Sequence, residues 1–216
     1  MLKLALAGLG VLALAAPTAA LAQTTQQNTY SVTASVTPKS SKASSKKPVP
    51  SALKFNYTVG ESHGLKPAAV KRYTIGFGGI RSNGKAFKTC QASQMNGTDS
   101  VCSTKALVGT GTLDSFVYAD SDPSGQNGGF DCKKTLHVWN AGANKAVLFI
   151  NGDPNQCGGV GALPAFPISY VKGDGGGTAL QFTVPKTVLH PIAGLSVAVR
   201  SVKSTIKKMM VTRELA

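Results

Sequence analysis

Apolar and polar residues alternate along most of the chain after residue 51. Leu53–Val59 alternates strictly between large apolar or aromatic residues and polar ones, and Val70–Phe77 continues the pattern. A period of two residues is typical of a β-strand that buries one face. The pattern recurs in further segments, at residues 113–118, 135–139, 146–150, 166–171, 179–184, 195–199 and 206–211.

Turn-forming sequences separate these segments. Asn83-Gly84, residues 140–144 and the glycine-rich residues 173–177 are typical of turns. Short strands at hairpin spacing predict an all-β fold over residues 52–216, an antiparallel β-sandwich of the immunoglobulin-like or jelly-roll-like kind. A closed barrel is the alternative. Residues 202–213 suit either a strand or a basic helix.

The first 22 residues have the pattern of a secretory signal peptide. Lys3 gives a short positive start, Leu4–Ala16 is an apolar run of 13 residues, and Ala20-Leu21-Ala22 is a small-x-small cleavage pattern. The run is shorter than the roughly 20 apolar residues that span a bilayer. We therefore expect export, cleavage before Gln23 and no transmembrane segment in the mature chain.

Residues 23–51 have the composition of a linker. Gln, Thr, Ser, Lys and Pro dominate them, and residues 37–51 carry four lysines and no acid. Such a segment buries too little to offset the entropy of ordering it, which predicts a disordered N-terminal tether. Residues 30–36 alternate and are a candidate edge strand within it. The tether is either a solvated spacer or an electrostatic attachment to an anionic envelope polymer.

The charge balance of the chain is strongly basic. It has 23 basic and 9 acidic residues, a formal net charge of +14, and its 42% apolar content excludes a wholly disordered chain. Most lysines beyond the tether are isolated along the predicted strands, only four basic residues are arginines, and no nucleic-acid-binding module is recognisable. We therefore expect an anionic cell-wall polymer or a carbohydrate as partner, and no nucleic acid.

All four cysteines follow the predicted signal, and export favours disulfides. Three pairings are possible. We expect Cys90–Cys102 and Cys132–Cys157, because both close short loops in a glycine-rich region. Each bond would stabilise the fold by about 3 kcal/mol by restricting the unfolded chain. A zinc site is disfavoured because the chain has no Cys-x-x-Cys pair and no histidine at ligand spacing from a cysteine.

One segment matches a catalytic motif. Gly60-Glu61-Ser62-His63-Gly64 fits the Gly-x-Ser-x-Gly pattern of a nucleophile elbow. That elbow needs a parallel sheet before the serine and a helix after it. Here a tether and one strand precede Ser62, and a strand-like segment follows soon after. The sequence therefore favours a glycine-rich loop.

Residues 120–131 resemble a calcium-binding loop in their spacing. Oxygen-bearing side chains stand at positions one, three, five and twelve, including Asp120, Asp122 and Asp131, and Gly125 stands at position six. No helices flank the segment, and Asn127 replaces the usual apolar residue. Calcium binding by the three carboxylates is one hypothesis, and a plain hydrophilic loop is the favoured one.

Trp139 is the only tryptophan of the chain. In a strand, Thr135, His137 and Trp139 share one face, while Leu136 and Val138 share the other. An exposed pair of His137 and Trp139 would stack on a sugar ring. The alternative, which we favour, places Trp139 in the core, because large aromatic side chains dominate cores.

The cysteine-containing segments resemble a group of secreted actinobacterial β-sandwich proteins of unknown function. In that group a cysteine is followed shortly by a Val-Gly-x-Gly turn that leads into a strand. The similar segments are Cys90, Cys102–Gly111, Phe130-Asp131-Cys132, Phe149–Gly152 and Phe182–Pro185. Ser103 departs from the pattern, since many of those proteins have proline there. The resemblance covers roughly residues 52–200, the extent of one domain, and implies a fold but no activity.

Three functions remain open. The favoured one is an exported, non-enzymatic β-sandwich, secreted or associated with the cell wall, that acts at the envelope as a binding or structural module without a cofactor. The second is a carbohydrate-binding module that uses Trp139. The third is a secreted hydrolase with Ser62 or a pair of carboxylates from residues 120–131 at its site.

Overall fold

The computed structural model describes residues 26–37, 43–44, 46–173 and 177–211, and the predicted signal peptide lies outside them. The described chain forms a ten-stranded sheet. Its strands are β1 (Asn28–Thr37), β2 (Val49–Glu61), β3 (Arg72–Phe77), β4 (Ile80–Arg81), β5 (Leu107–Ala119), β6 (Phe130–Gly142), β7 (Lys145–Gly152), β8 (Phe166–Lys172), β9 (Thr178–Thr183) and β10 (Leu195–Val211). Helices are short: the α-helix α1 (Lys186–Leu189) and 3-10 turns at Gly84–Ala86, Ala92–Gln94 and Thr104–Ala106. No described helix has the length and apolar character to cross a membrane.

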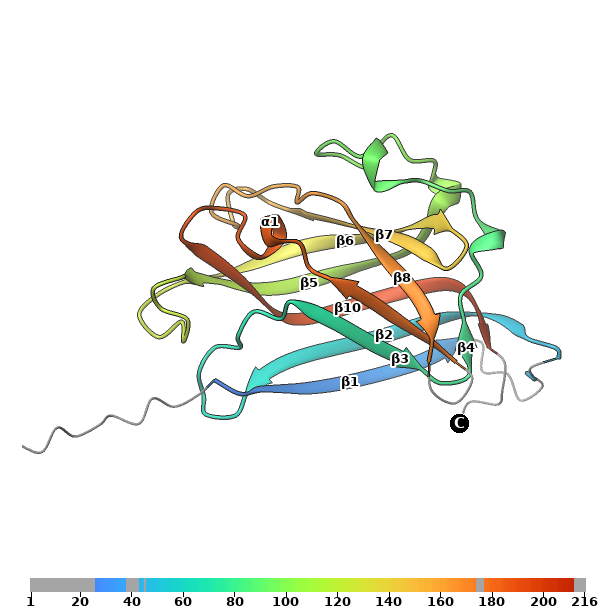
Figure 1. Cartoon of the computed structure of the whole chain (residues 1–216), viewed down its shortest axis with the longest axis horizontal. Coiled ribbons are helices and arrows are strands. Elements are labelled where there is room, and N and C mark those ends of the chain that lie inside the picture. The colour runs from blue at the N-terminus through green and yellow to red at the C-terminus, as the bar shows by residue number, and fades with distance from the viewer. Residues whose placement is uncertain (1–25, 38–42, 45, 174–176, 212–216) are drawn as a thin grey trace, which may run out of the picture.

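The sheet folds over on itself to form an antiparallel β-sandwich, as the sequence predicts. Its strand order is β1-β2-β10-β5-β6-β7-β8-β9-β3, with β4 paired to β10. In Figure 1, β3 and β8 cross in front of β2 and β10, so one end of the sheet covers the other. No pairing joins the two terminal strands, β1 and β3, within the described residues, which distinguishes the fold from a closed barrel.

The main core lies between the two layers. In β2 the alternation places Leu53, Phe55, Tyr57 and Val59 on the inner face, and all four are buried. Partners from the opposite layer include Ile168 of β8. Burying one such side chain contributes about 1.5–3 kcal/mol, so the period-two pattern itself supplies most of the drive to fold.

A second, smaller core lies on the outer face of β6 and β7. The segment from Ser82 to Ala106 folds over these strands and covers Trp139, Val147 and Phe149. Asn140 anchors the segment, since its Nδ2 donates to the Gly84 and Lys88 carbonyls at 3.0 Å each. The rest of this cluster is Cys90, Met95, Cys102 and Ala106.

Both predicted disulfides are confirmed. Cys90–Cys102 closes the covering segment on itself, and Cys132–Cys157 joins β6 to the loop that follows β7. No free cysteine remains among the described residues. The two crosslinks therefore fix one loop on each side of the β6–β7 hairpin.

Two boundaries differ from the sequence prediction. Residues 28–37 form the edge strand β1, which confirms the candidate edge strand at residues 30–36. Residues 49–51 begin β2, so the predicted linker over 23–51 is wrong for these three residues. Nearly all of β1 is exposed, which explains why its composition resembles a tether. The segments 195–199 and 206–211 belong to one long strand, β10, which is interrupted by irregular registers rather than by a turn.

Candidate functional site

The outer face of β1, β2, β10 and β5 is polar. Side chains on this face alternate with the core residues of the same strands. The strand registers align two rows across the four strands, which are, from β1 to β5, Ser35, Lys54, Thr205 and Thr110 in one row and Thr33, Asn56, Lys203 and Thr112 in the other. The face therefore presents hydroxyl, amide and ammonium groups and no aromatic side chain in either row.

These rows line an open groove of about 520 Å³. Lys54 and Lys203 are both exposed and line it, and the groove has no acidic residue. Neither ammonium takes part in an ion pair within the described chain. Asp114, one register step beyond the groove, accepts a hydrogen bond from Ser201 Oγ at 2.9 Å. The groove therefore carries uncompensated positive charge.

Asn56 adds an unsatisfied acceptor to the same groove. Its Oδ1 is buried and has no hydrogen-bond partner among the described residues. A buried polar atom without a partner costs stability. A ligand that donates a hydrogen bond to Asn56 Oδ1 would remove this cost. Asn56 stands opposite Lys203 in the strand register. A ligand that carries both hydroxyls and anionic groups matches this pair of side chains.

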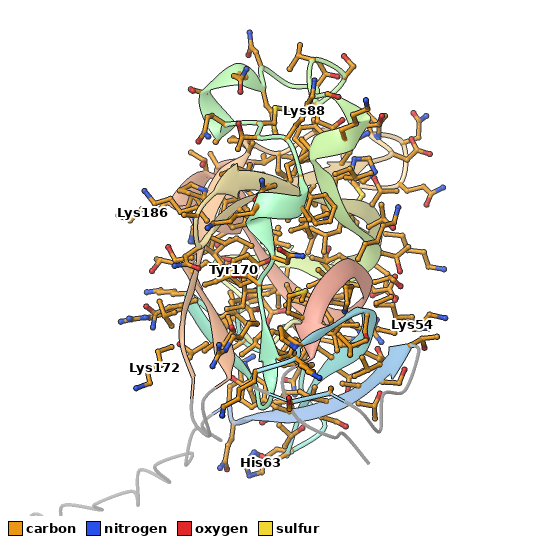
Figure 2. All side chains as sticks on the ribbon, turned by 90° about the vertical axis from the view of Figure 1, so that its right-hand side faces the viewer. Lys54, His63, Lys88, Tyr170, Lys172 and Lys186 are labelled. Atoms are coloured by element: carbon orange, nitrogen blue, oxygen red, sulfur yellow. A yellow bond between two sulfur atoms is a disulfide. The ribbon has the colours of Figure 1, made fainter. Side chains whose placement is uncertain are left out.

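Figure 2 shows that the exposed lysines are not confined to this groove. Lys54 projects on the opposite side of the molecule from Lys172 and Lys186 in that view. Lys172 and Lys186 lie at the end of β8 and at the start of α1. These two positions give a charge-matched control for any test of the groove.

Lys54, Asn56 and Lys203 were not predicted from the sequence as site residues. The alternation in Leu53–Val59 places Lys54 and Asn56 on the polar face, and this signal was available. The alternation does not show which strand pairs with β2. Lys203 lies about 150 residues further along the chain, and only the β2–β10 pairing brings it opposite Asn56.

His137 and Trp139 share the outer face of β6, as predicted, but they do not form an exposed platform. Trp139 is only 4% exposed and its Nε1 donates to Asp99 Oδ2 at 3.0 Å. His137 Nδ1 lies 2.5 Å from the same oxygen. The covering segment supplies Asp99, so the stacking face of Trp139 is occupied by protein. The hypothesis that Trp139 binds a sugar ring is therefore wrong, and the favoured core position is correct.

The structure does not bring Asp120, Asp122 and Asp131 together. Asp120 accepts from Ser196 Oγ at 2.5 Å, and Asp131 pairs with Arg200 at 2.6 Å. Asp122 accepts from Ser124 Oγ and the Asn127 amide, both at 2.7 Å, and these bonds hold its pKa below the usual value. Each carboxylate thus has protein partners of its own. No group of three potential metal ligands is found in the described chain, and the calcium hypothesis does not fit this arrangement.

Ser62 lies in the turn that follows β2. Its Oγ is 3.1 Å from His63 Nδ1, and that nitrogen is 3.1 Å from Glu61 Oε1. Burial alone would raise the pKa of Glu61, but hydrogen bonds from the amides of Gln27, His63 and Leu65 outweigh it and lower the pKa to about 2. Glu61 therefore organises the turn as a permanent anion. This agrees with the loop that the sequence favoured.

A second cluster of serine, histidine and aspartate was not anticipated. Ser196 Oγ donates to Asp120, and His190 Nδ1 lies 3.2 Å from Ser196 Oγ and 3.4 Å from Asp120 Oδ1. In a catalytic triad the serine donates to histidine, and the other ring nitrogen faces the acid. Here the serine proton points at the carboxylate and a single ring nitrogen faces both groups. These contacts link the start of β10 to the end of β5. They do not activate Ser196 as a nucleophile.

Comparison with known proteins adds no functional assignment, since no family model, no curated protein and no solved structure matches this chain.

Proposed function

We propose that this chain is an exported, non-enzymatic β-sandwich that binds an anionic polymer of the cell envelope through the groove on its outer face. The observation that carries the proposal is the combination of two unpaired lysines with the orphan amide oxygen of Asn56 in one open groove. The predicted signal peptide, the two disulfides and the net charge of +14 support an extracytoplasmic role.

Physical chemistry favours a polymer over a small ion. The groove crosses four strands, and its donors and acceptors repeat in rows rather than converging on a point. Exposed lysines are strongly hydrated and bind a single anion weakly, whereas a chain of anionic groups engages several at once. Such binding weakens as salt shortens the Debye length from about 10 Å at 0.1 M to about 3 Å at 1 M.

Retention on immobilised polymers tests the proposal. Polygalacturonate offers carboxylates and sugar hydroxyls, polyglutamate offers carboxylates on an amide backbone without hydroxyls, and dextran offers hydroxyls without charge. We expect retention in the order polygalacturonate, polyglutamate, dextran, and elution from the first two by salt. Strong retention on dextran, or retention on polygalacturonate that salt leaves unchanged, would contradict the electrostatic part of the proposal.

Charge-matched variants locate the site. Lys54→Gln combined with Lys203→Gln should weaken polygalacturonate binding by about tenfold or more, because a lysine near an anionic surface contributes about 1 kcal/mol. Lys172→Gln combined with Lys186→Gln removes the same charge elsewhere and should have a much smaller effect. Equal losses in the two double variants would show that net charge alone causes binding. Asn56→Ala should weaken binding to polygalacturonate and leave binding to polyglutamate unchanged.

A further inference from the structure

A cavity lies between the two layers of the sandwich, separate from the outer groove. Its volume is about 100 Å³, and its walls are almost entirely apolar side chains. Representative lining residues are Phe55, Leu113, Leu136, Phe166, Leu180 and Val197. For comparison, an apolar cavity of about 150 Å³ holds a benzene molecule. The space therefore suits a ligand with a small hydrocarbon body.

Lys134 brings a charge to this apolar wall. It lies on the inner face of β6, lines the cavity and is 4% exposed. Its Nζ donates to Ser115 Oγ at 2.8 Å and contacts the disulfide sulfur of Cys132 at 2.7 Å. An ammonium has three N–H donors, and a sulfur is a weak acceptor. No carboxylate pairs with Lys134 in the part of the chain that the structure describes.

Tyr73 supplies a second polar atom without a partner. Its ring lines the cavity and packs against Phe182, with ring centroids 5.0 Å apart. Its hydroxyl is buried and has no hydrogen-bond partner in the described part of the chain. Two of the few polar groups of the cavity are thus incompletely satisfied, although buried polar groups normally find partners.

The charge state of Lys134 at neutral pH is positive. Burial lowers its pKa to about 8, which leaves most of the population protonated at pH 7. A buried ammonium without a counter-ion is unfavourable, and an anion placed beside it in a medium of low dielectric constant is strongly attracted. The complement of this cavity is a single negative charge on a small apolar body.

We propose that the cavity binds a small monocarboxylate, with its carboxylate on Lys134 and a hydrocarbon body of about three carbons among the core side chains. Tyr73, whose hydroxyl has no partner among the described residues, lines the same cavity. This site lies inside the sandwich and does not depend on the function proposed for the outer groove.

Isothermal titration and thermal unfolding at pH 7 test the proposal with four probes: butyrate and isobutyrate, and their uncharged counterparts butan-1-ol and isobutanol. We expect the two carboxylates to bind and to raise Tm, and the alcohols to bind much more weakly. Equal binding of acids and alcohols, or no binding of either acid, would overturn the assignment.

Variants identify the charge responsible. Lys134→Met keeps the approximate length of the side chain and should weaken carboxylate binding by roughly 30-fold or more, the usual effect of removing one partner of a buried charge pair. Lys133→Met, at the neighbouring exposed position, should leave binding unchanged. Unaltered butyrate binding in Lys134→Met would refute the role of Lys134.

The pH dependence of the natural protein keeps the proposal testable if the variant fails to fold. Carboxylate binding should decline above pH about 8, as Lys134 loses its proton. Chemical-shift changes of the Lys134 side chain on addition of butyrate provide a spectroscopic readout. A butyrate affinity that stays constant between about pH 7 and 10 would exclude Lys134 as the counter-ion.

Discussion

The two faces of β2 obey different constraints within a single strand. Leu53 and Phe55 on the inner face are buried against the opposite layer, while Lys54 and Asn56, which alternate with them, face the outer groove. Close packing restricts the inner face, where the loss of a single methylene group lowers stability. The outer face carries charge and hydrogen-bonding groups that the fold does not need. Residues that are adjacent in the sequence thus have different roles: one stabilises the core and the next is available to bind a ligand.

Lys134 and Lys203 show the same difference for one residue type. Lys203 is exposed, has no ion-pair partner among the described residues and lines the polar groove. Lys134 is buried in an apolar wall, and burial lowers its pKa to about 8. We expect substitutions at Lys134 to alter stability and its pH dependence, and substitutions at Lys203 to alter binding alone.

The largest effect is expected from the core side of β2. Leu53→Ala removes a side chain that is 1% exposed and should lower the free energy of unfolding by about 2–5 kcal/mol. Lys54→Ala, one residue along, should change it by less than about 0.5 kcal/mol. Urea unfolding followed by the fluorescence of Trp139 measures both. Similar values for the two variants would remove the distinction between the faces.

The disulfide beside Lys134 should have the next largest effect. Replacing Cys132 and Cys157 together by alanine should destabilise the protein by about 3 kcal/mol, because the bond closes a loop with a sequence separation of 25. The same change at Cys90 and Cys102, with a separation of 12, should destabilise slightly less. Denaturant unfolding of the two double variants gives the comparison. A much greater loss at Cys90–Cys102 would show that the covering segment, rather than the inner layer, dominates stability.

Lys134→Met should stabilise the ligand-free protein at pH 7, since it removes a buried charge that lacks a counter-ion. The pKa of Lys134 is about 8 in the folded chain and 10.5 in its unperturbed state. Between these values the unfolded chain binds more protons than the folded chain, so the stability of the natural protein rises with pH. The difference in the free energy of unfolding between Lys134→Met and the natural protein should therefore fall by on the order of 2 kcal/mol from pH about 7.5 to 10.

Unfolding curves of both proteins across that pH range measure this effect, with Lys133→Met as a control that leaves Lys134 in place. A parallel pH dependence in the natural protein and in Lys134→Met would place the titration elsewhere.

The smallest effect on stability is expected at the groove. Lys203→Gln should change the free energy of unfolding by no more than about 0.5 kcal/mol, because the side chain is exposed and unpaired among the described residues. The same variant should nevertheless show reduced retention on polygalacturonate. Thermal unfolding and retention, measured on one preparation, separate the two properties. A marked fall in Tm would mean that Lys203 supports the fold.

Local patterns predicted most of the sheet. The alternation in residues 53–59 and 166–171 lies within β2 and β8, where alternate residues are buried. Residues 179–184 coincide closely with β9, although the consecutive residues 178–180 of that strand are all buried. β1 was harder to recognise, since both of its faces are largely exposed and its composition is that of a tether. The disulfides were predictable because short loops limit the reach of each cysteine.

The sites depend on contacts that no local pattern contains. Trp139 could be assigned to the core, but its partner Asp99 lies in a separate segment, 40 residues away. Lys134 stands on the apolar side of an alternating strand, and this exception was present in the sequence. Its lack of a counter-ion became visible only when all the strands around it were in place. The strands themselves could be predicted from the sequence, but their order in the sheet could not, and the sites depend on that order.

The position of β10 has a consequence for how the chain reaches its folded state. Residues 195–211 are made after every other strand, yet they lie between β2 and β5 in the middle of the sheet. Until they arrive, β2 and β5 each expose an unpaired edge beside an apolar face. While the chain is being synthesised, β2 and β5 therefore stay unjoined until β10 follows them. The pairing of β10 with both strands then completes this part of the sandwich.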